Sequence, residues 1–367
     1  MKGDGVMNIE QARRKAWQGE RLNFADAMAL YEDNDLLFLA QCARQAKEHQ
    51  SGKKVFYTVN KHINLTNICS ANCPLCAFQV KAGDKRGFVL EHDDIERILA
   101  EAKQVKNLSE VHIVSALHPD KPFTYYVDVV KQVKKALPAV DVKAFTPVEI
   151  VNFAKMNSKT IKEVLIILQK AGLDSLPGGG AEILSDRVRQ IICPKKANSA
   201  EWIETMKTAH QLGIRTNASM MYGHVETITE RLQHLFTLRD IQDETQGFQA
   251  FMLFPFHPAN TELGEKYNLQ RVGSWEDMKM LALSRLILDN IAHVKAFWIM
   301  MTMPIAQLAL GFGADDLDGT IGEEKIIHAA GAKTNTGITR ETLKAIIKET
   351  GYEPVERDTF YQEVQKF

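Results

Sequence analysis

Short apolar runs rich in β-branched residues recur along this chain and alternate with longer segments of helical periodicity. The runs predict strands, and the longer segments predict amphipathic helices. The predicted strands are residues 55–63, 110–116, 141–145, 173–176, 214–220, 248–253, 294–300 and a weakly patterned 311–314. The predicted helices between them cover about residues 93–106, 124–137, 158–171, 199–212, 227–243 and 275–290. Regular alternation of this kind indicates a parallel α/β fold.

Eight such units with right-handed crossovers predict an α/β fold of the TIM-like (β/α)8 barrel type. A partly open six-stranded barrel is the nearest alternative. Residues 8–47 have helical periodicity and predict two or three helices packed on the barrel. We therefore expect an N-terminal helical cover (1–50), the barrel (51–330) and a C-terminal helical extension (331–367) packed on the barrel, in which Pro354 ends the helical pattern.

Composition narrows the function classes. The chain has 367 residues, of which 45% are hydrophobic and 25% charged, as in ordinary globular proteins. Its net charge of −1 provides no basic field for nucleic acid or an anionic membrane. No apolar run reaches the roughly 18 residues of a membrane span, and no signal-like segment follows Met1. We expect a cytoplasmic protein that acts on a small molecule, with no nucleic-acid or membrane partner.

Three cysteines follow the first predicted strand with the spacing C-x3-C-x2-C: Cys69, Cys73 and Cys76. A loop at the carboxyl end of a strand is where α/β barrels place their chemistry. Thiolates bind iron–sulfur clusters, and a cubane of four irons needs four terminal ligands, so three cysteines leave one iron open. That iron can be chelated by S-adenosylmethionine. The spacing therefore predicts a 4Fe-4S cluster that cleaves S-adenosylmethionine to a 5′-deoxyadenosyl radical.

Other uses of the cysteines are less favoured. A structural zinc site needs four ligands, usually in two separated pairs, and only Cys73 and Cys76 form such a pair. His62 lies on the predicted strand, seven residues before the first cysteine, where ligation is awkward. A disulfide framework is not expected in a long chain with five cysteines. Cys42 and Cys193 receive no role. A zinc- or cluster-stabilised binding module is the non-enzyme alternative.

Small and polar residues follow other predicted strands. Ser115 and Ala116 come at the end of the second strand, where small side chains let a ligand approach backbone carbonyls that can receive the methionine amino group. Residues 178–180 are three glycines, which permit positive φ, and Glu182 can accept hydrogen bonds from a ribose or an ammonium. A glycine run alone is most often a flexible loop. The predicted cofactor-binding residues are Phe78, Ser115, Ala116, Gly179, Glu182 and Asn217.

Three histidines lie just beyond predicted strands: His118, His224 and His257. A lone histidine is more often structural than catalytic, but we expect at least one of these to face the cavity. The acidic segment 311–320 suggests a metal loop. It lacks the twelve-residue calcium-loop pattern, so a polar loop that closes the barrel mouth is the favoured interpretation.

These motifs resemble a known family. The cysteine triad is similar to that of the radical S-adenosylmethionine (radical SAM) superfamily. Longer segments resemble the aminofutalosine synthase family of the futalosine route to menaquinone, and the resemblance runs from about residue 8 to 361. Those segments are residues 62–78, 111–120, 143–150, 171–183, 215–226, 249–260 and 313–325.

The cluster motif is shared with dehypoxanthine futalosine cyclases and with deazaflavin cofactor synthases. Residues 173–182, 222–227 and 313–320 favour the aminofutalosine synthase family over these two. One departure is Ser115-Ala116, where that family usually carries two glycines. Both residues are small, so close backbone approach survives with less conformational freedom.

The resemblance implies a reaction. The adenosyl radical would add to the vinyl double bond of 3-[(1-carboxyvinyl)oxy]benzoate, the aryl group would migrate from oxygen to carbon, and the former carboxylate would leave as carbon dioxide or bicarbonate. The products would be aminofutalosine and methionine, so S-adenosylmethionine would be consumed. An electron donor such as flavodoxin or ferredoxin would be needed. The related enzymes would use the radical to abstract hydrogen instead.

A substrate with two carboxylates calls for cations or other donors in the cavity. Arg215 and Lys143 on predicted strands and Arg285 on a predicted helix are candidates, although an ordinary ion pair is the commoner role for any one of them. We expect Arg215, Arg285 and His257 to bind the substrate. We expect His224 and His118 to be catalytic, and His224 is favoured because it lies within the family-like segment 222–227.

Overall fold

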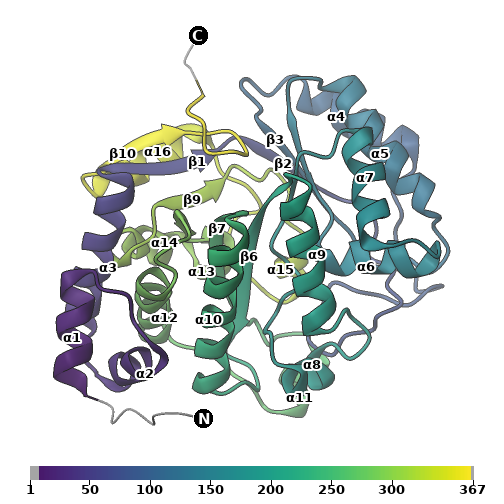
Figure 1. The fold of residues 1–367 in the computed structure, drawn as a ribbon. Helices are drawn as coiled ribbons and strands as arrows, with labels where there is room; N and C mark the ends of the chain where they lie inside the picture. Colours follow the sequence, from purple (N-terminus) through teal and green to yellow (C-terminus); the bar gives the residue numbers. More distant parts are fainter. Residues whose placement is uncertain (1–7, 365–367) are drawn as a thin grey trace.

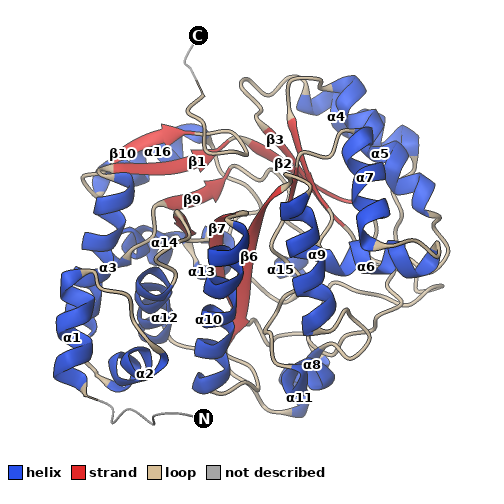
Figure 2. Cartoon of the chain, in the orientation of Figure 1, coloured by secondary structure: helices blue, strands red, loops and turns tan. Residues whose placement is uncertain are grey.

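The computed structural model of the chain describes residues 8–364. Within them a curled sheet is surrounded by helices (Figures 1 and 2). The strands are β1 (Lys54–Thr58), β2 (Asn60–Asn64), β3 (Glu110–Val114), β4 (Asp141–Ala144), β5 (Ser175–Leu176), β6 (Arg215–Tyr222), β7 (Phe248–Pro255), β8 (His293–Lys295), β9 (Asp316–Gly319) and β10 (Glu353–Glu356).

The helices cover the outside of the sheet, and most of them connect consecutive strands. They are α1 (Ile9–Gln18), α2 (Phe24–Glu32), α3 (Leu36–Ser51), α4 (His92–Ala102), α5 (Phe123–Ala136), α6 (Pro147–Met156), α7 (Ile161–Ala171), α8 (Asp186–Ile192), α9 (Ser199–Gln211), α10 (Ile228–Thr245), α11 (Glu262–Lys266), α12 (Ser274–Ile287), α13 (Trp298–Met301), α14 (Met303–Ala309), α15 (Ile326–Ala329) and α16 (Arg340–Glu349). In the described part of the chain, no helix is both long enough and apolar enough to cross a membrane.

All paired strands run parallel, in the order β10-β1-β9-β8-β7-β6-β5-β4-β3-β2. The run β1–β2 is interrupted only at Val59, and its two halves pair differently: β1 with β9 and β10, β2 with β3. Just beyond β9, Ile321 accepts a backbone hydrogen bond of 3.0 Å from His62. The run therefore lies between the two sides of the curled sheet. The prediction of a TIM-like α/β barrel is confirmed, with ten strand segments in place of eight.

Local chemistry explains where several barrel helices begin. A capping box starts α6 at Thr146, α7 at Thr160, α9 at Asn198 and α10 at Thr227, each with a glutamate three residues later. The side-chain oxygen of each first residue and the carboxylate of its glutamate satisfy backbone N–H groups that the first helical turn leaves free. Of these helices, α6 and α10 start shortly after β4 and β6 end, whereas α7 and α9 follow the helices α6 and α8.

The N-terminal helices occupy one side of the barrel. Figure 1 shows α1, α2 and α3 beside α12, and Tyr31 of α2 donates a hydrogen bond to Glu276 of α12. Ala12, Leu30, Leu39 and Ala43 are buried and join the apolar cluster that also contains the interior of α12. Burial of these apolar faces attaches the first three helices to the barrel.

Two predicted strands and the predicted C-terminal extension differ from the structure. The predicted strand 294–300 is β8 followed by α13, since a continuous apolar run does not distinguish a buried strand from a short helix. Residues 310–312 form a 3-10 helix, and the strand β9 starts later, at Asp316. The C-terminal extension is not only helical: it adds β10, which pairs with β1 at the sheet edge. Pro354 is tolerated there because an edge strand need not supply every ladder hydrogen bond.

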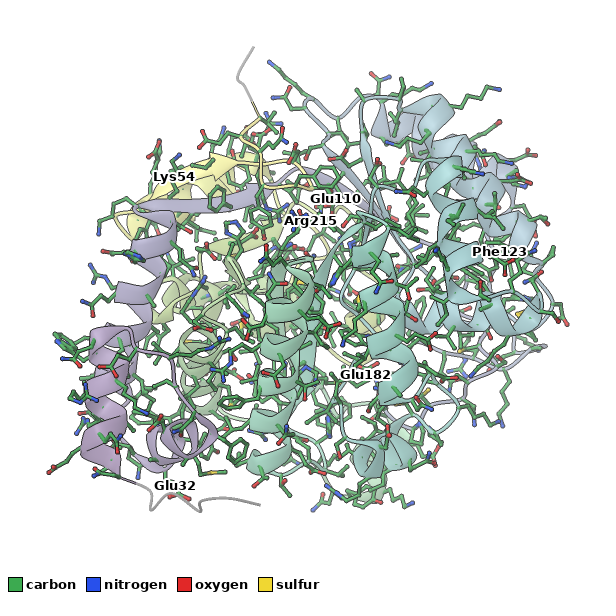
Figure 3. The ribbon with its side chains drawn as sticks, viewed as in Figure 1. Glu32, Lys54, Glu110, Phe123, Glu182 and Arg215 are labelled. Atoms are coloured by element: carbon green, nitrogen blue, oxygen red, sulfur yellow. The ribbon has the colours of Figure 1, made fainter. Side chains whose placement is uncertain are left out.

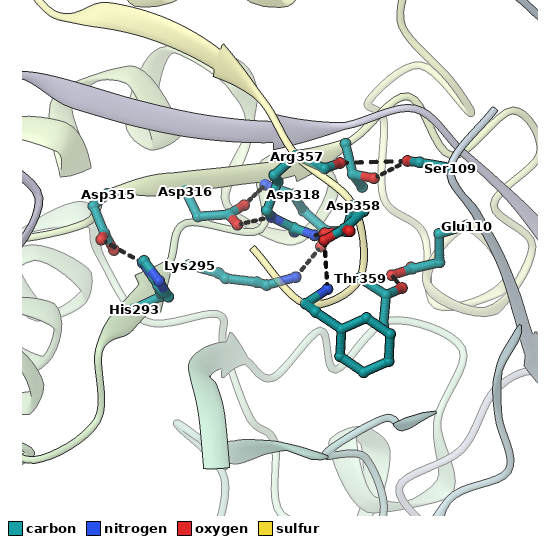
Figure 4. Close-up of polar contacts among 12 residues, drawn as sticks. Ser109, Glu110, His293, Lys295, Asp315, Asp316, Asp318, Arg357, Asp358 and Thr359 are labelled. Atoms are coloured by element: carbon teal, nitrogen blue, oxygen red, sulfur yellow. Dashed lines mark hydrogen bonds and ion pairs between the residues drawn. The ribbon is translucent and has the colours of Figure 1, made fainter. Parts of the chain in front are cut away.

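The chain after β10 closes the end of the barrel at which the strands begin (Figure 4). Arg357 is fully buried, and its Nε donates to Asp316 Oδ2 across 2.7 Å. Thr359 donates from its hydroxyl to Glu110 on β3. The ring of Tyr361 stacks on His293 with centroids 3.6 Å apart. The C-terminal segment is thus part of the barrel's polar core.

The acidic segment 311–320 is not a loop at the barrel mouth, which corrects the sequence interpretation. Each of its acids is buried in an ion pair with a different cation. The pairs are Asp315 with Arg285 at 2.8 Å, Asp316 with Arg357 at 2.7 Å, and Asp318 with Lys295 at 2.7 Å.

Candidate functional site

A cavity of about 310 Å³ lies within the curled sheet and extends to the loops at the carboxyl ends of the strands. Side chains from β2–β4 and β6–β9 line it. One part is bordered by Cys69, Cys73 and Cys76, and apolar side chains including Met252 and Phe297 form part of its wall. This is the position at which α/β barrels bind their substrates.

The cysteine loop is held by its own backbone. Cys69 N–H donates to the carbonyl of Val80, and Cys76 N–H donates to that of Cys73, both at 3.0 Å. Burial raises the pKa of the Cys73 thiol to about 12. In the described part of the chain, no three His, Cys, Asp or Glu side chains are grouped so as to hold a single metal ion. The three thiols nevertheless border one cavity, as ligands of a shared cluster must.

An ion pair between a half-buried lysine and a buried glutamate lies beside the cysteines. Lys196 Nζ donates to Glu182 Oε1 across 2.6 Å, and both residues line the cavity. Burial opposes ionisation of Glu182, but the positive groups around it, Lys196 foremost, together outweigh burial and lower the carboxyl pKa. The same ammonium lowers the pKa of Cys73 and Cys76 against the larger effect of burial. Lys196 was not predicted from the sequence, because it lies on the segment between α8 and α9 with no motif around it.

Several buried polar atoms at the cavity lack a partner among the described residues. They are Ser115 Oγ, Asn217 Oδ1 and Gln79 Oε1, and all three residues line the cavity. Buried polar groups are normally hydrogen-bonded. Unpaired atoms next to three cysteines and an ion pair therefore fit a site built for a polar ligand.

Glu149 is a further cavity residue that the sequence analysis missed. Its carboxylate accepts hydrogen bonds from the backbone N–H of Ser115 at 2.9 Å and of Thr146 at 2.7 Å. Burial raises its pKa to about 7. The backbone N–H of Ser115 is therefore occupied by protein, and only the hydroxyl and the carbonyl of that residue remain for a ligand.

The glycine run is required by close packing. A Cβ at Gly178 would lie 2.6–2.8 Å from backbone atoms of Ala218 on β6, and Gly180 has a φ of +79°. Glycine is the residue that accepts both conditions without strain. The loop after β5 is thus pressed against β6, which brings Gly179 and Glu182 to the cavity.

The cavity also contains a row of basic side chains, His62, His112 and Lys143, which we call the basic row. These residues pair directly across β2, β3 and β4. The two imidazole rings have centroids 4.5 Å apart, and Lys143 Nζ donates to Glu110. In the sequence, only the β3 part of this row is indicated. Glu110, His112 and Val114 alternate with other residues, which places three cavity-lining side chains on one face of β3.

Two predicted substrate-binding arginines do not reach the cavity. Arg215 is exposed at the start of β6 and donates to the carbonyl of Gln246. It is the first residue of β6, at the end where the strands begin, and Figure 3 shows it apart from Glu182. Arg285 is buried on α12 and paired with Asp315, outside the cavity. Residues at the start of a strand or in a helix interior face away from the carboxyl-end loops, so these two assignments are corrected.

The three histidines chosen from strand ends have structural partners. His118 Nδ1 accepts backbone N–H bonds from Asp120 and Lys121, at 3.1 and 3.2 Å. His257 Nε2 lies 2.9 Å from the carbonyl of Met300. None of His118, His224 and His257 is among the described residues that line the cavity.

His224 is buried beside Glu226. Its Nδ1 lies 2.7 Å from Glu226 Oε2, and its Nε2 has no partner among the described residues. The imidazole is therefore held in one orientation with one nitrogen left for another group. Its role in catalysis stays a prediction.

Comparison with known proteins gives the family. Residues 63–238 match the radical SAM superfamily, and residues 245–366 match the CofH/MqnC C-terminal region. The chain is 41% identical to aminodeoxyfutalosine synthase of Thermus thermophilus over 96% of this chain and 94% of that protein.

The chain belongs to the radical SAM superfamily.

A second relative carries a different activity. The chain is 38% identical to the 5-amino-6-(D-ribitylamino)uracil–L-tyrosine 4-hydroxyphenyl transferase of Methanococcoides burtonii, over 97% of this chain and 99% of that protein. The solved structure of methylornithine synthase has the same fold, with a TM-score of 0.73 at 15% identity over 94% of this chain and 97% of that one.

These findings confirm an enzyme that uses a 4Fe-4S cluster and S-adenosylmethionine, as the cysteine spacing predicted. The residues present fit both groups: three thiols border the cavity, and an ion pair and unpaired polar atoms lie among the other lining residues. The zinc-stabilised binding module is thereby excluded as the interpretation of the chain.

Proposed function

We propose that this enzyme catalyses the aminodeoxyfutalosine synthase reaction of menaquinone biosynthesis. The observation that carries the proposal is the 41% identity with the Thermus thermophilus enzyme over nearly the whole of both chains. In that reaction the adenosyl group of S-adenosylmethionine is joined to the vinyl carbon of 3-[(1-carboxyvinyl)oxy]benzoate. The aryl group moves from oxygen to carbon, the former carboxylate leaves, and methionine is released.

Cys69, Cys73 and Cys76 would hold the cluster, and the cluster with S-adenosylmethionine would supply a 5′-deoxyadenosyl radical. Lys196 lies beside these cysteines and would pair with the methionine carboxylate, while Glu182 would accept from the ribose or the ammonium. Asn217 and Ser115 would offer their unpaired oxygens to the same cofactor, and Phe78 would pack near the adenine. A one-electron donor such as flavodoxin or ferredoxin would complete the system.

The rest of the cavity would bind the substrate. Its apolar wall suits an aromatic ring. Met221, Met252, Phe254 and Phe297 all contribute to the lining. The chain's own contribution is thus to bring the vinyl group next to the cofactor and to hold the ring in one orientation.

The tyrosine 4-hydroxyphenyl transferase activity is the second candidate, because a relative with that activity aligns over 97% of this chain. Anaerobic turnover of the cluster-loaded enzyme separates the two. With reductant and S-adenosylmethionine, we expect an adenosyl-containing product from the enol-ether benzoate. Product formed only from L-tyrosine and the ribitylaminouracil would reverse the assignment.

A further inference from the structure

The basic row lies in the cavity at mid-height of the sheet. Successive residues of a strand face opposite sides, so Glu110, His112 and Val114 all point to the cavity and form three levels on β3. Glu110 is at the level where the strands begin, and Val114 is at the level next to the cysteine loop. The basic row therefore lies between the closed floor of the barrel and the site of the cysteines.

The fixed cations of this region are already neutralised. Lys143 Nζ pairs with Glu110, and Lys295 Nζ pairs with Asp318 across 2.7 Å. Neither lysine offers a free charge to a ligand.

The two imidazoles are different, because their ring nitrogens are not committed. His112 Nδ1 is 3.9 Å from Glu110 Oε1, beyond hydrogen-bond reach. His62 Nε2 has only a long contact of 3.5 Å with Asn60 Nδ2. The described residues give His112 no side-chain hydrogen bond. Two adjacent rings thus present uncommitted nitrogens to the cavity.

Charged groups surround the two rings from several elements. Glu110 comes from β3, Lys143 from β4, Asp318 from β9, and Glu324 from the segment before α15. Burial outweighs the carboxylates, so the pKa of His62 is lowered and that of His112 falls to about 3. Both rings are therefore neutral at pH 7 among these groups. An added carboxylate in contact with them would favour the imidazolium form.

We propose that His62 and His112 bind the ring carboxylate of an aryl-carboxylate substrate and take up one proton when it binds. The inference rests on the proposed function. In the enol-ether benzoate, the vinyl group must lie next to the cofactor, and the ring carboxylate is at the other end of the molecule. The basic row is on the far side of Val114 from the cysteine loop, where that end of the substrate would lie.

The test is calorimetric titration of the cluster-loaded enzyme with S-adenosylmethionine and no reductant, so that binding is measured without turnover. The probes are 3-[(1-carboxyvinyl)oxy]benzoate and the matched phenyl enol ether that lacks the ring carboxylate. Titrations in two buffers of different ionisation enthalpy give the number of protons taken up. The variants are H62Q, H112Q and the double variant, with H92Q as the control because His92 is exposed on α4.

We expect the wild-type enzyme to take up about one proton with the benzoate and none with the phenyl ether. H62Q and H112Q should bind the benzoate about tenfold or more weakly, since each replaces a ring that can become a charged donor with a neutral amide. The double variant should take up no proton. All variants should bind the phenyl ether as the wild type does, which shows that the site is intact.

Equal weakening of both ligands, unchanged benzoate affinity, or wild-type binding without proton uptake would overturn the inference. If the wild type binds and converts the benzoate while the variants lose nothing, this inference fails alone. If the wild type does not bind the benzoate at all, the proposed function fails and the inference fails with it.

Discussion

Lys196 Nζ donates to Glu182 Oε1 across 2.6 Å in the cavity that Cys69, Cys73 and Cys76 border. The pair brings together two segments, the glycine loop after β5 and the stretch between α8 and α9. It places one half-buried positive charge and one buried negative charge beside the thiols. A zwitterionic amino-acid ligand presents the complementary pair of charges.

The first prediction concerns this pair. K196M should weaken S-adenosylmethionine binding about tenfold or more, because the ligand carboxylate loses a charge-assisted partner and Glu182 is left without one. The neighbouring Lys195 is exposed, so K195M is a matched control that should bind normally. Equilibrium dialysis of the cluster-loaded enzyme measures both. Equal affinities in K196M and the wild type would remove Lys196 from the cofactor site.

The second prediction distinguishes the cysteines. C73A should lose the brown cluster absorbance, the bound iron and the turnover, because a cluster with three protein ligands does not survive loss of one. C42A and C193A should keep the absorbance, the iron and the turnover, although both thiols are buried as Cys73 is. Iron and sulfide analysis after anaerobic reconstitution is the measurement. Iron loss in C193A equal to that in C73A would contradict the assignment of the ligands.

Much of the fold was predictable because the sequence alternates cleanly between strand and helix patterns. The capping boxes at Thr146, Thr160, Asn198 and Thr227 mark helix starts in the sequence itself. The elements that the sequence did not predict are short or mix polar and apolar residues. The strand β10 has four residues, including Pro354 and two glutamates, and is stabilised by pairing with β1 some 300 positions earlier in the chain.

The candidate site was only partly predictable, because many of its contacts join residues that are distant in sequence. The cysteine spacing is local and was sufficient. The partners of Arg285 and Lys143 are distant in sequence: Asp315 and Glu110 decide that these cations are neutralised by protein. Lys196 has no sequence signal at all, since only the fold brings it to Glu182.

The third prediction concerns the barrel floor. R357M should lower the free energy of unfolding by about 3–5 kcal/mol, because it leaves Asp316 charged and buried without its partner. Arg44 pairs with Glu48 on the surface, so R44M should change stability by no more than about 1 kcal/mol. Equilibrium unfolding in urea compares the two. Equal effects would show that the C-terminal segment does not stabilise the barrel.

The fourth prediction is a pH dependence. His234 is fully buried, its Nδ1 accepts from Leu184 N–H, and burial lowers its pKa to about 3. Because the folded pKa is below the unfolded one, the unfolded chain binds the extra proton first as pH falls. The stabilisation is complete above pH ~6.5 and is lost toward pH ~3, at about 1.4 kcal/mol per pH unit.

The variant H234Q should therefore be less stable than the wild type at pH 7.5, and the difference should shrink on acidification. Thermal unfolding midpoints between pH 7.5 and 4.5 provide the comparison. H92Q, which alters an exposed histidine, should follow the wild type. A constant difference between H234Q and the wild type over this range would mean that the neutral imidazole is not what acid disrupts.

The most direct test of the proposed reaction follows the adenosyl group. The cluster-loaded enzyme is given reductant, the enol-ether benzoate and S-adenosylmethionine with a carbon-13 label in its ribose, and the products are resolved by mass spectrometry. We predict that the label appears in an aryl-containing adduct, one for each methionine released, with little labelled 5′-deoxyadenosine. Substrate-dependent labelled 5′-deoxyadenosine without an adduct would show hydrogen abstraction and would contradict the account.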